Sequence, residues 1–288
     1  MKHSPIEVQP MKVAVLSDIQ GNLPALEAAS EHILTWGPDL VVMAGDLINR
    51  GPSSRECLDH FDALRRGQGW LPIQGNHEVW VLRCGHELPL DSIDADMRRF
   101  ADWTFRQIGD MEDALLGWPD HLCFHGDSED NWVHVTHGTM AGNRDGISAS
   151  VPDKDLQGRL PEDIALFVTA HTHKPLERRL NGIQILNVGS VGSPFDGDPR
   201  ASYGQLEYRD GRWKTRILRL AYDRARTERD FLESGFIDEG GPLARIVYEE
   251  WRRARLLMPT WHQRYRKAVC DGEIARDLAV TDFLKSLG

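Results

Sequence analysis

Short apolar segments that end in polar residues recur along the first two-thirds of this 288-residue chain. Each has the length of a strand buried inside a sheet, and the polar residues after it mark the strand's end. An Asp-Gly turn joins the last two such segments and predicts a hairpin. The strands expected on this pattern are 11–17, 40–44, 70–74, 132–137, 164–170, 183–188, 203–208 and 213–220.

Helical spacing of apolar residues follows the first two strands, at 23–29 and 53–64. A strand–helix–strand–helix–strand order predicts a parallel sheet with right-handed crossovers. Ligand-bearing loops in such a sheet lie beyond the carboxyl ends of the strands. We therefore expect the polar motifs that follow these strands to gather at one edge of the sheet.

Two further regions are predicted to be mainly helical. Residues 77–118 form a candidate cap, and the chain from Tyr222 onward forms a helical tail that Gly240, Gly241 and Pro242 interrupt. The tail segment 248–257 is amphipathic and basic, which favours a docked helix with a solvated charged face. A partner-binding or oligomerising helix is the alternative. The aromatic residues expected in the core of the cap are Trp80, Phe100, Trp103, Phe105 and Trp118.

Composition places the chain among folded proteins of the cytoplasm. Hydrophobic residues make up 41% and charged residues 27%, both ordinary values for a globular chain. No segment approaches the ~20 apolar residues that a membrane span needs, and residues 1–5 lack the apolar stretch of a secretory signal. The four cysteines are scattered without a CxxC pair, as expected in a reducing compartment.

The net charge of −10 is unevenly distributed. Residues 1–208 hold 17 basic against 31 acidic residues, whereas residues 209–288 hold 17 basic against 13 acidic residues. An acidic catalytic region argues against a nuclease and against gripping of duplex nucleic acid, which requires a basic face. Phosphate substrates remain compatible, because bound metal ions reverse the sign of the local field.

Five polar motifs at strand ends carry the candidate chemistry. Their carboxylates, amide oxygens and imidazoles are the ligand types of a pair of moderately hard divalent metals. Each motif alone has an ordinary interpretation, such as a helix cap, a turn or a structural histidine. Their joint occurrence indicates a two-metal hydrolytic site. The motifs are Asp18-Ile19-Gln20-Gly21-Asn22, Gly45-Asp46-Leu47-Ile48-Asn49-Arg50-Gly51, Gly75-Asn76-His77-Glu78, His137-Gly138 and His171-Thr172-His173.

Asp46 is the central candidate. It follows a strand and a glycine, where one carboxylate can bridge two ions ~3.5–4 Å apart. Arg50, four residues further on, can bind two phosphate oxygens with its forked guanidinium. His77 has three open interpretations: a metal ligand, a phosphate-binding cation or a general acid.

The order of these motifs resembles that of the calcineurin-like metallophosphoesterase superfamily over roughly residues 11–220. Residues 186–192 and 196–203 are similar to its bacterial and archaeal phosphodiesterase branch. The resemblance implies an α/β fold, a four-layer α-β-β-α sandwich of two mixed sheets flanked by helices. It also implies a metallophosphoesterase domain over 1–221, with a helical cap insertion at 77–130 and a helical C-terminal extension at 222–288.

The resemblance also implies the role of each site residue. Metal one would be held by Asp18, Gln20, Asp46 and His173, and metal two by Asp46, Asn76, His137 and His171. The catalytic residues facing the phosphate would be His77 and Arg50, and Asn49 and Arg200 would complete the substrate-binding set.

Two positions depart from the family pattern. Gln20 stands where the family usually has His, and its harder, less basic amide oxygen should either weaken this metal position or favour Mn²⁺ or Fe over Zn²⁺. The expected cofactor is therefore a pair of divalent ions, Mn²⁺ first, with Fe, Zn²⁺ or Ni²⁺ as alternatives. Asn49 stands where protein phosphatases usually carry Asp, which argues against protein phosphatase activity.

The leading hypothesis is a metal-dependent phosphoric ester hydrolase, acting on small phosphodiesters or phosphomonoesters, nucleotides included, through a metal-bridging hydroxide. Because residues 50–52 resemble those of diadenosine tetraphosphatases, a diadenosine-polyphosphate-type hydrolase is one alternative. A catalytically weak binding module with the same fold is the other, although the presence of His77 favours an enzyme. The expected partner is a small phosphorylated substrate, with no membrane, and a homo-oligomer stays open.

Overall fold

The computed structural model describes residues 11–90, 92–127 and 131–288 of the chain. The N-terminal segment, in which we expected no secretory signal, and residues 128–130 at the end of the expected cap lie outside the described residues. The strands are β1 (Met11–Leu16), β2 (Leu40–Ala44), β3 (Leu71–Ile73), β4 (His121–His125), β5 (Trp132–Thr136), β6 (Leu166–Thr169), β7 (Leu176–Leu180), β8 (Ile183–Asn187), β9 (Ala201–Arg209) and β10 (Arg212–Leu220). The α-helices are α1 (Leu23–Trp36), α2 (Ser54–Gln68), α3 (Asn76–His86), α4 (Ser92–Ile108), α5 (Glu112–Leu116), α6 (Arg224–Glu233), α7 (Phe236–Glu239), α8 (Pro242–Arg253), α9 (Met258–Cys270) and α10 (Arg276–Lys285).

Within the described part of the chain, the strands form two five-stranded sheets, one in the order β10-β9-β1-β2-β3 and the other in the order β4-β5-β6-β8-β7. Strands β1, β2 and β3 run parallel to one another, whereas β9 pairs antiparallel with both β1 and β10. In the second sheet β5, β6 and β8 run parallel, and β4 and β7 form antiparallel edges. Both sheets are therefore mixed, as the family resemblance predicted.

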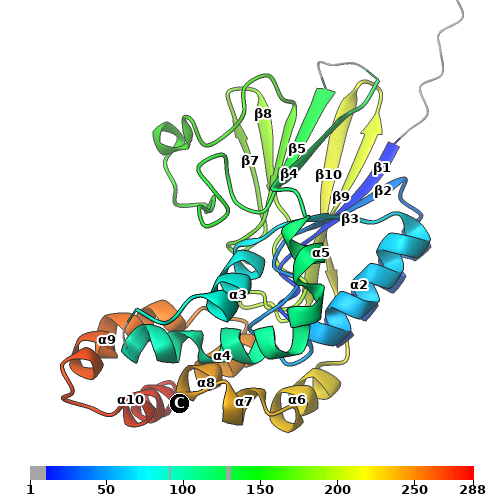
Figure 1. Cartoon of the computed structure of the whole chain (residues 1–288). Helices are drawn as coiled ribbons and strands as arrows, with labels where there is room; N and C mark the ends of the chain where they lie inside the picture. The colour runs from blue at the N-terminus through cyan, green and yellow to red at the C-terminus, as the bar shows by residue number, and fades with distance from the viewer. Residues whose placement is uncertain (1–10, 91, 128–130) are drawn as a thin grey trace, which may run out of the picture.

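The two sheets pack face to face, with α1 and α2 beside the first sheet and the other helices mostly along the lower side of the molecule (Figure 1). Val13 and Val15 of β1 share an apolar core with Val135 of β5 and Val168 of β6. The opposite face of the first sheet packs against α1 and α2 in a second core. The α/β sandwich with flanking helices is confirmed.

Local sequence explains where α1 begins and ends. The side chain of Asn22 accepts a hydrogen bond from the backbone N–H of Ala25, and Pro24 occupies the first turn, where its missing N–H costs least. The helix ends at Gly37, which adopts a left-handed conformation with φ of 65°. The last residue of the first polar motif, Asn22, is therefore also the N-cap of α1.

The cap and the tail share one core instead of each packing alone. Residues 77–118 are mostly helical as expected, but the expected cap insertion at 77–130 includes β4, an edge strand of the second sheet. Phe100 and Trp103 of α4 pack with residues of the tail, whereas Phe105 and Trp118 pack against the core of the first sheet. The aromatic residues of the cap therefore do not form a separate core.

The tail lies against α4 along the lower side of the molecule in Figure 1. Helix α8 buries Ile246, Val247 and Trp251 in the shared core and keeps Arg252 on the surface, where it pairs with Glu249. The docked helix with a charged outer face is confirmed. Among the described residues, no helix is both long enough and apolar enough to cross a membrane.

Candidate metal centre and active site

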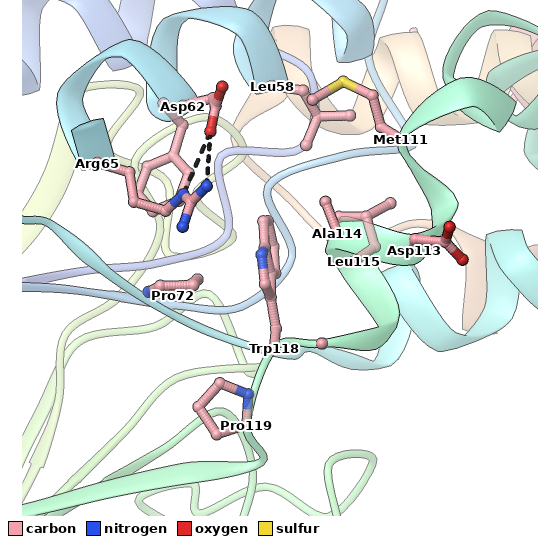
Figure 2. A pocket seen from close by; sticks show the side chains of 12 residues that line it. Leu58, Asp62, Arg65, Pro72, Met111, Asp113, Ala114, Leu115, Trp118 and Pro119 are labelled. Carbon is pink, nitrogen blue, oxygen red and sulfur yellow. Dashed lines mark hydrogen bonds and ion pairs between the residues drawn. The ribbon is translucent and has the colours of Figure 1, made fainter.

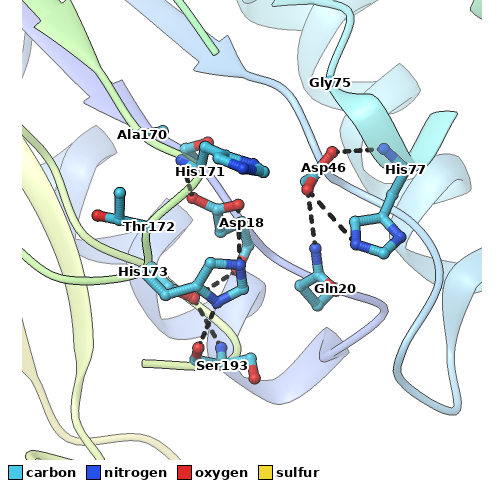
Figure 3. A network of polar contacts seen from close by, with 12 residues as sticks. Asp18, Gln20, Asp46, Gly75, His77, Ala170, His171, Thr172, His173 and Ser193 are labelled. Atoms are coloured by element: carbon cyan, nitrogen blue, oxygen red, sulfur yellow. Dashed lines mark hydrogen bonds and ion pairs between the residues drawn. The ribbon is translucent and has the colours of Figure 1, made fainter. Parts of the chain in front are cut away.

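The polar motifs meet where the carboxyl ends of the parallel strands of both sheets come together. Backbone hydrogen bonds join the loops: the N–H of Asp18 donates to the carbonyl of Gly45 at 3.1 Å, and that of Gln20 to the carbonyl of Asp46 at 3.0 Å. In the second sheet, the N–H of Ala170 donates to the carbonyl of His137 at 3.0 Å. The N–H of His171 then donates to Oδ2 of Asp18 at 3.1 Å, which connects the two sheets (Figure 3).

The backbone of these loops is held in an unusual conformation. L-residues at positive φ cost roughly 1–2 kcal/mol each, so they persist only where surrounding structure enforces them. Within the described residues, positive φ outside glycine is concentrated in the polar motifs. The motif residues with positive φ are Asp18, Gln20, Asp46, Asn49, Arg50, His171 and His173.

Asp18, Asp46 and His173 form the first candidate metal cluster, with one ligand atom of each within 4.8 Å of the others. Nδ1 of His173 donates to the carbonyl of Ser193, which leaves Nε2 facing Oδ1 of Asp18 at 3.2 Å. Oδ1 of Asp18 and Oε1 of Gln20 are buried without a hydrogen-bond partner among the described residues. Because buried oxygens without a partner are costly, this arrangement fits a bound cation.

Asp46, His137 and His171 form the second candidate cluster within the same distance limit. Nδ1 of His137 donates to the carbonyl of Ala44 at 2.9 Å, so Nε2 faces Oδ1 of Asn76 at 3.0 Å and Oδ2 of Asp46 at 3.3 Å. A histidine fixed through one nitrogen presents the other as a metal ligand. Asp46 belongs to both clusters, which is the arrangement of a bridging carboxylate.

The electrostatics of the site are dominated by its two buried carboxylates. Burial by itself would lower the pKa of His137, but the neighbouring Asp46 carboxylate outweighs it and raises the pKa to about 10. Burial opposes ionisation of Asp46, yet attraction to His137 and His77 holds its pKa well below the usual range. The carboxylates therefore favour positive charge beside them, which a divalent cation also supplies.

Glu78 holds the loop that carries Asp46, a role that the sequence analysis did not assign. Its carboxylate accepts the backbone N–H groups of Asp46, Leu47 and Gly75, each at 2.8 Å. A Cβ on Gly75 would lie 2.2 Å from Oδ1 of Asp46, so only glycine permits this approach. The Gly75-Asn76-His77-Glu78 motif contained the signal, because Glu at the third position of a helix can reach back to its start.

His77 and Asn49 lie together at the side of the cluster. Asn49 is fully buried, and its side-chain amide hydrogen-bonds Nδ1 of His77 at 2.9 Å. Nε2 of His77 lies 3.9 Å from Oδ2 of Asp46, and burial lowers the pKa of His77 to about 3. The structure thus places Asn49, predicted to bind substrate, behind His77.

The two predicted arginines differ in position. Arg50 lines the cavity at the site, where its guanidinium pairs with Glu250 of α8 and lies 5.8 Å from the ring centroid of Phe195. Arg200 is not brought to the cluster, because its exposed guanidinium pairs with Asp198 two residues away, within the same loop.

A cavity of about 440 Å³ opens beside the two clusters. Its walls include Gly146, Ser148, Lys174, Phe195 and Leu256, none of which the sequence analysis singled out. A second cavity of about 390 Å³ lies between α2 and the segment around α5, where Asp62 pairs with Arg65 (Figure 2). It contains no residue of the predicted site.

The fold and the clustered ligands define a metal-dependent phosphoesterase of the two-sheet sandwich class. The model of the family described as calcineurin-like phosphoesterase matches residues 11–176, so the chain belongs to this family.

Relatives and solved structures support this assignment. The chain is similar to phosphodiesterase YfcE of Escherichia coli, with 27% identity over 68% of this chain and 88% of that protein. It is 32% identical over 57% of its length to a symmetrical bis(5'-nucleosyl)-tetraphosphatase of a Marinomonas species, of which it covers 58%. A metallophosphoesterase structure from Sphaerobacter thermophilus superposes with a TM-score of 0.65 at 25% identity, covering 85% of this chain and 99% of that one.

Proposed function

We propose that the protein is a dinuclear metal-dependent phosphoesterase that hydrolyses small phosphodiesters or phosphomonoesters, nucleotides included. The observation that carries the proposal is the position of Asp46, which belongs to both candidate metal clusters and lines the adjacent cavity. The similarity to phosphodiesterase YfcE supports the reaction class.

The ions would be held by the seven residues that the family resemblance implies. Bound there, a pair of divalent ions supplies Lewis acidity toward the phosphate and lowers the pKa of water. Gln20, with its amide oxygen unpartnered among the described residues, supports Mn²⁺ as the physiological metal. A cytoplasmic location stays a prediction.

The chain's own residues then have separate tasks. Arg50 binds and orients a phosphate oxygen at the wall of the cavity. His77, neutral at this pKa, donates a hydrogen bond from Nε2 to the leaving oxygen or to the phosphate, and Asn49 keeps its ring in place. The presence of Arg50 and His77 beside Asp46 in one cavity favours an enzyme over a binding module.

A diadenosine-polyphosphate-type hydrolase is the second candidate. Arg50 and Lys174 both line the cavity, so that two cations are available for a chain of phosphates. The similarity to the Marinomonas tetraphosphatase is consistent with this activity. Assaying dinucleoside polyphosphates beside p-nitrophenyl esters separates the two candidates.

Asp46→Asn tests the proposal while keeping the shape of the side chain. We expect metal content to fall and hydrolysis of bis-p-nitrophenyl phosphate with Mn²⁺ to drop by roughly 100- to 1,000-fold, because several kcal/mol of transition-state stabilisation are lost. Asp59→Asn, on the exposed face of α2, is the matched control. An unchanged rate in Asp46→Asn, or no turnover of any phosphate ester by the metal-loaded wild type, would contradict the proposal.

A further inference from the structure

The guanidinium of Arg50 is held by a residue of the C-terminal tail. Its Nη2 donates to Oε2 of Glu250, which lies on α8, 200 residues further along the chain. The side chain of Glu250 is fully buried, and that of Arg50 retains 11% of its exposure. Removing one partner of a buried ion pair leaves the other charge uncompensated, so each charge depends on the other.

Both carboxylate oxygens of Glu250 have defined partners. Oε1 accepts the backbone N–H groups of Leu257 and Met258, each at 2.7 Å, at the start of α9. The dipole of α9 favours a negative charge at this end. The carboxylate is therefore fixed by the packing of the tail helices, and Oε2 is directed to Arg50.

The guanidinium of Arg50 is only partly satisfied by Glu250. Its Nε is buried without a hydrogen-bond partner in the part of the chain that the structure describes. Arg50 lines the same cavity as Asp46 and His77. Because a guanidinium carries several N–H donors in one rigid plane, anchoring one edge on Glu250 sets the direction in which another edge meets a phosphate oxygen.

Glu250 also offsets an electrostatic cost. An arginine close to a site for two divalent cations is repelled by them, and the repulsion is strong in a poorly solvated environment. A buried carboxylate in contact with Arg50 compensates for that repulsion. The ion pair thus keeps the charged guanidinium of Arg50 at the place where the substrate phosphate binds.

Another residue of the tail, Leu256, lines the cavity itself. It lies in the connection between α8 and α9 and is 41% exposed. The connection is tied to the β8–β9 loop, because the N–H of Gly197 donates to the carbonyl of Ala254 at 2.9 Å. Leu256 and Phe195 provide the large apolar part of the cavity wall.

We propose that the C-terminal tail completes the substrate site: Glu250 is a positioning residue for Arg50, and Leu256 contacts an apolar group of the phosphate ester. This inference rests on the proposed phosphoesterase function. It gives the 222–288 extension a role in substrate binding beyond that of a structural support.

Glu250→Gln tests the first part, because glutamine retains one acceptor oxygen for the start of α9 but lacks the second for Arg50. We expect the KM for p-nitrophenyl phosphate to rise about tenfold with a smaller change in kcat. Affinity of the Mn²⁺-loaded protein for inorganic phosphate, measured by calorimetry, should fall by a similar factor. Glu249→Gln is the matched control, since Glu249 pairs with Arg252 on the outer face of the same helix.

A double-mutant cycle separates positioning from a merely structural role. In an Arg50→Ala background, Glu250→Gln should change KM and phosphate affinity by less than about twofold, because its effect passes through Arg50. Equal effects of Glu250→Gln in both backgrounds would overturn the inference. So would a Glu250→Gln variant with the wild-type KM.

The same measurements distinguish the inference from the proposed function. If the wild type binds phosphate but hydrolyses no ester, the proposed reaction fails and the phosphate affinities alone decide the role of Glu250. If the wild type neither binds phosphate nor hydrolyses an ester, both proposals fail.

Leu256→Ala tests the second part on an exposed side chain that the fold does not require. We expect kcat/KM for bis-p-nitrophenyl phosphate to fall about three- to tenfold, with phosphate affinity unchanged. Leu278→Ala, on α10 and likewise exposed, serves as the control. If Glu250→Gln does not fold, the inference is tested by comparing Leu256→Ala with Leu278→Ala. An unaltered kcat/KM in Leu256→Ala then overturns it.

Discussion

Single residues at the centre are held in conformations that their side chains alone would disfavour. Asp46 has a φ of 56° and is 1% exposed, with its backbone N–H bound by the carboxylate of Glu78. Two carboxylates and their histidines share one buried space, an arrangement that could hold a cation. Strain and buried charge therefore coincide at this site, as they commonly do at sites of function.

Asn49→Gly removes the amide that orients His77 without adding strain, because the residue has a φ of 71° and glycine accepts positive φ readily. We expect kcat to fall roughly 10- to 100-fold, part of the 10²–10³ that one well-placed hydrogen-bond donor to the transition state contributes. Steady-state kinetics with p-nitrophenyl phosphate measure the effect.

Asn181→Gly is the control for this prediction, since Asn181 has a φ of 50° in the turn between β7 and β8. The control should retain the wild-type kcat. Equal values of kcat for both variants would show that the contact between Asn49 and His77 does not matter for turnover.

At the scale of elements, the start of α3 is placed by the close approach of Gly75 to the loop after β2. Gly75→Ala would bring a Cβ to within 2.4 Å of the backbone nitrogen of Asp46. We expect the loop to shift and bound metal, measured by elemental analysis, to fall below one ion per chain. Gly67→Ala, in the last turn of α2 with open space around it, should leave metal content unchanged. Full metal content in Gly75→Ala would contradict this account.

The elements that the sequence did not predict are the two edges of the second sheet. Strand β4 reads HLCFH and alternates exposed with half-buried residues, and β7 reads LERRL with three charged residues. Charged residues are common at sheet edges, where they deter pairing with other chains. Buried strands such as β2 were predicted because both faces are covered and the apolar run is continuous.

The site residues that the sequence predicted and those that it did not differ in what brings them to the site. Asp18, Asp46 and His137 directly follow strands, so topology alone brings them to one edge. Leu256 reaches the cavity, and Glu250 reaches Arg50, only through the packing of tail helices on α4, for which the sequence contains no local signal. Arg200 had a favourable position in its motif, yet Asp198 holds its side chain on the surface.

At the scale of the whole molecule, cap and tail should unfold together because they share one core. Phe236 is fully buried and makes ring contacts with Phe100, Trp103 and Phe231. Phe236→Ala should lower the free energy of unfolding by about 3–5 kcal/mol. It should also lower the midpoint of a single calorimetric transition of the metal-free protein. Leu278→Ala, on the surface, should change stability by less than about 0.5 kcal/mol. Two separate transitions would show that the tail folds independently.

Metal removal should destabilise the entire chain, because the candidate ligands come from both sheets. Asp18 and Asp46 follow strands of the first sheet, whereas His137, His171 and His173 follow strands of the second. A ligand that binds only the folded state at about 100 times its Kd adds about 2.7 kcal/mol of stability. We therefore expect a chelator to lower the Tm and Mn²⁺ to restore it.

The expected size of this effect depends on Asp46. Asp46→Asn should lose most of the Mn²⁺-dependent rise in Tm, and Asp59→Asn should retain it, when both are measured by thermal unfolding across a Mn²⁺ titration. An equal rise in all three proteins would place the stabilising ions elsewhere on the chain. If Mn²⁺ raises the Tm only of proteins with an intact Asp46, the ions that stabilise the junction of the two sheets bind at Asp46. They are then the same ions that the proposed reaction uses.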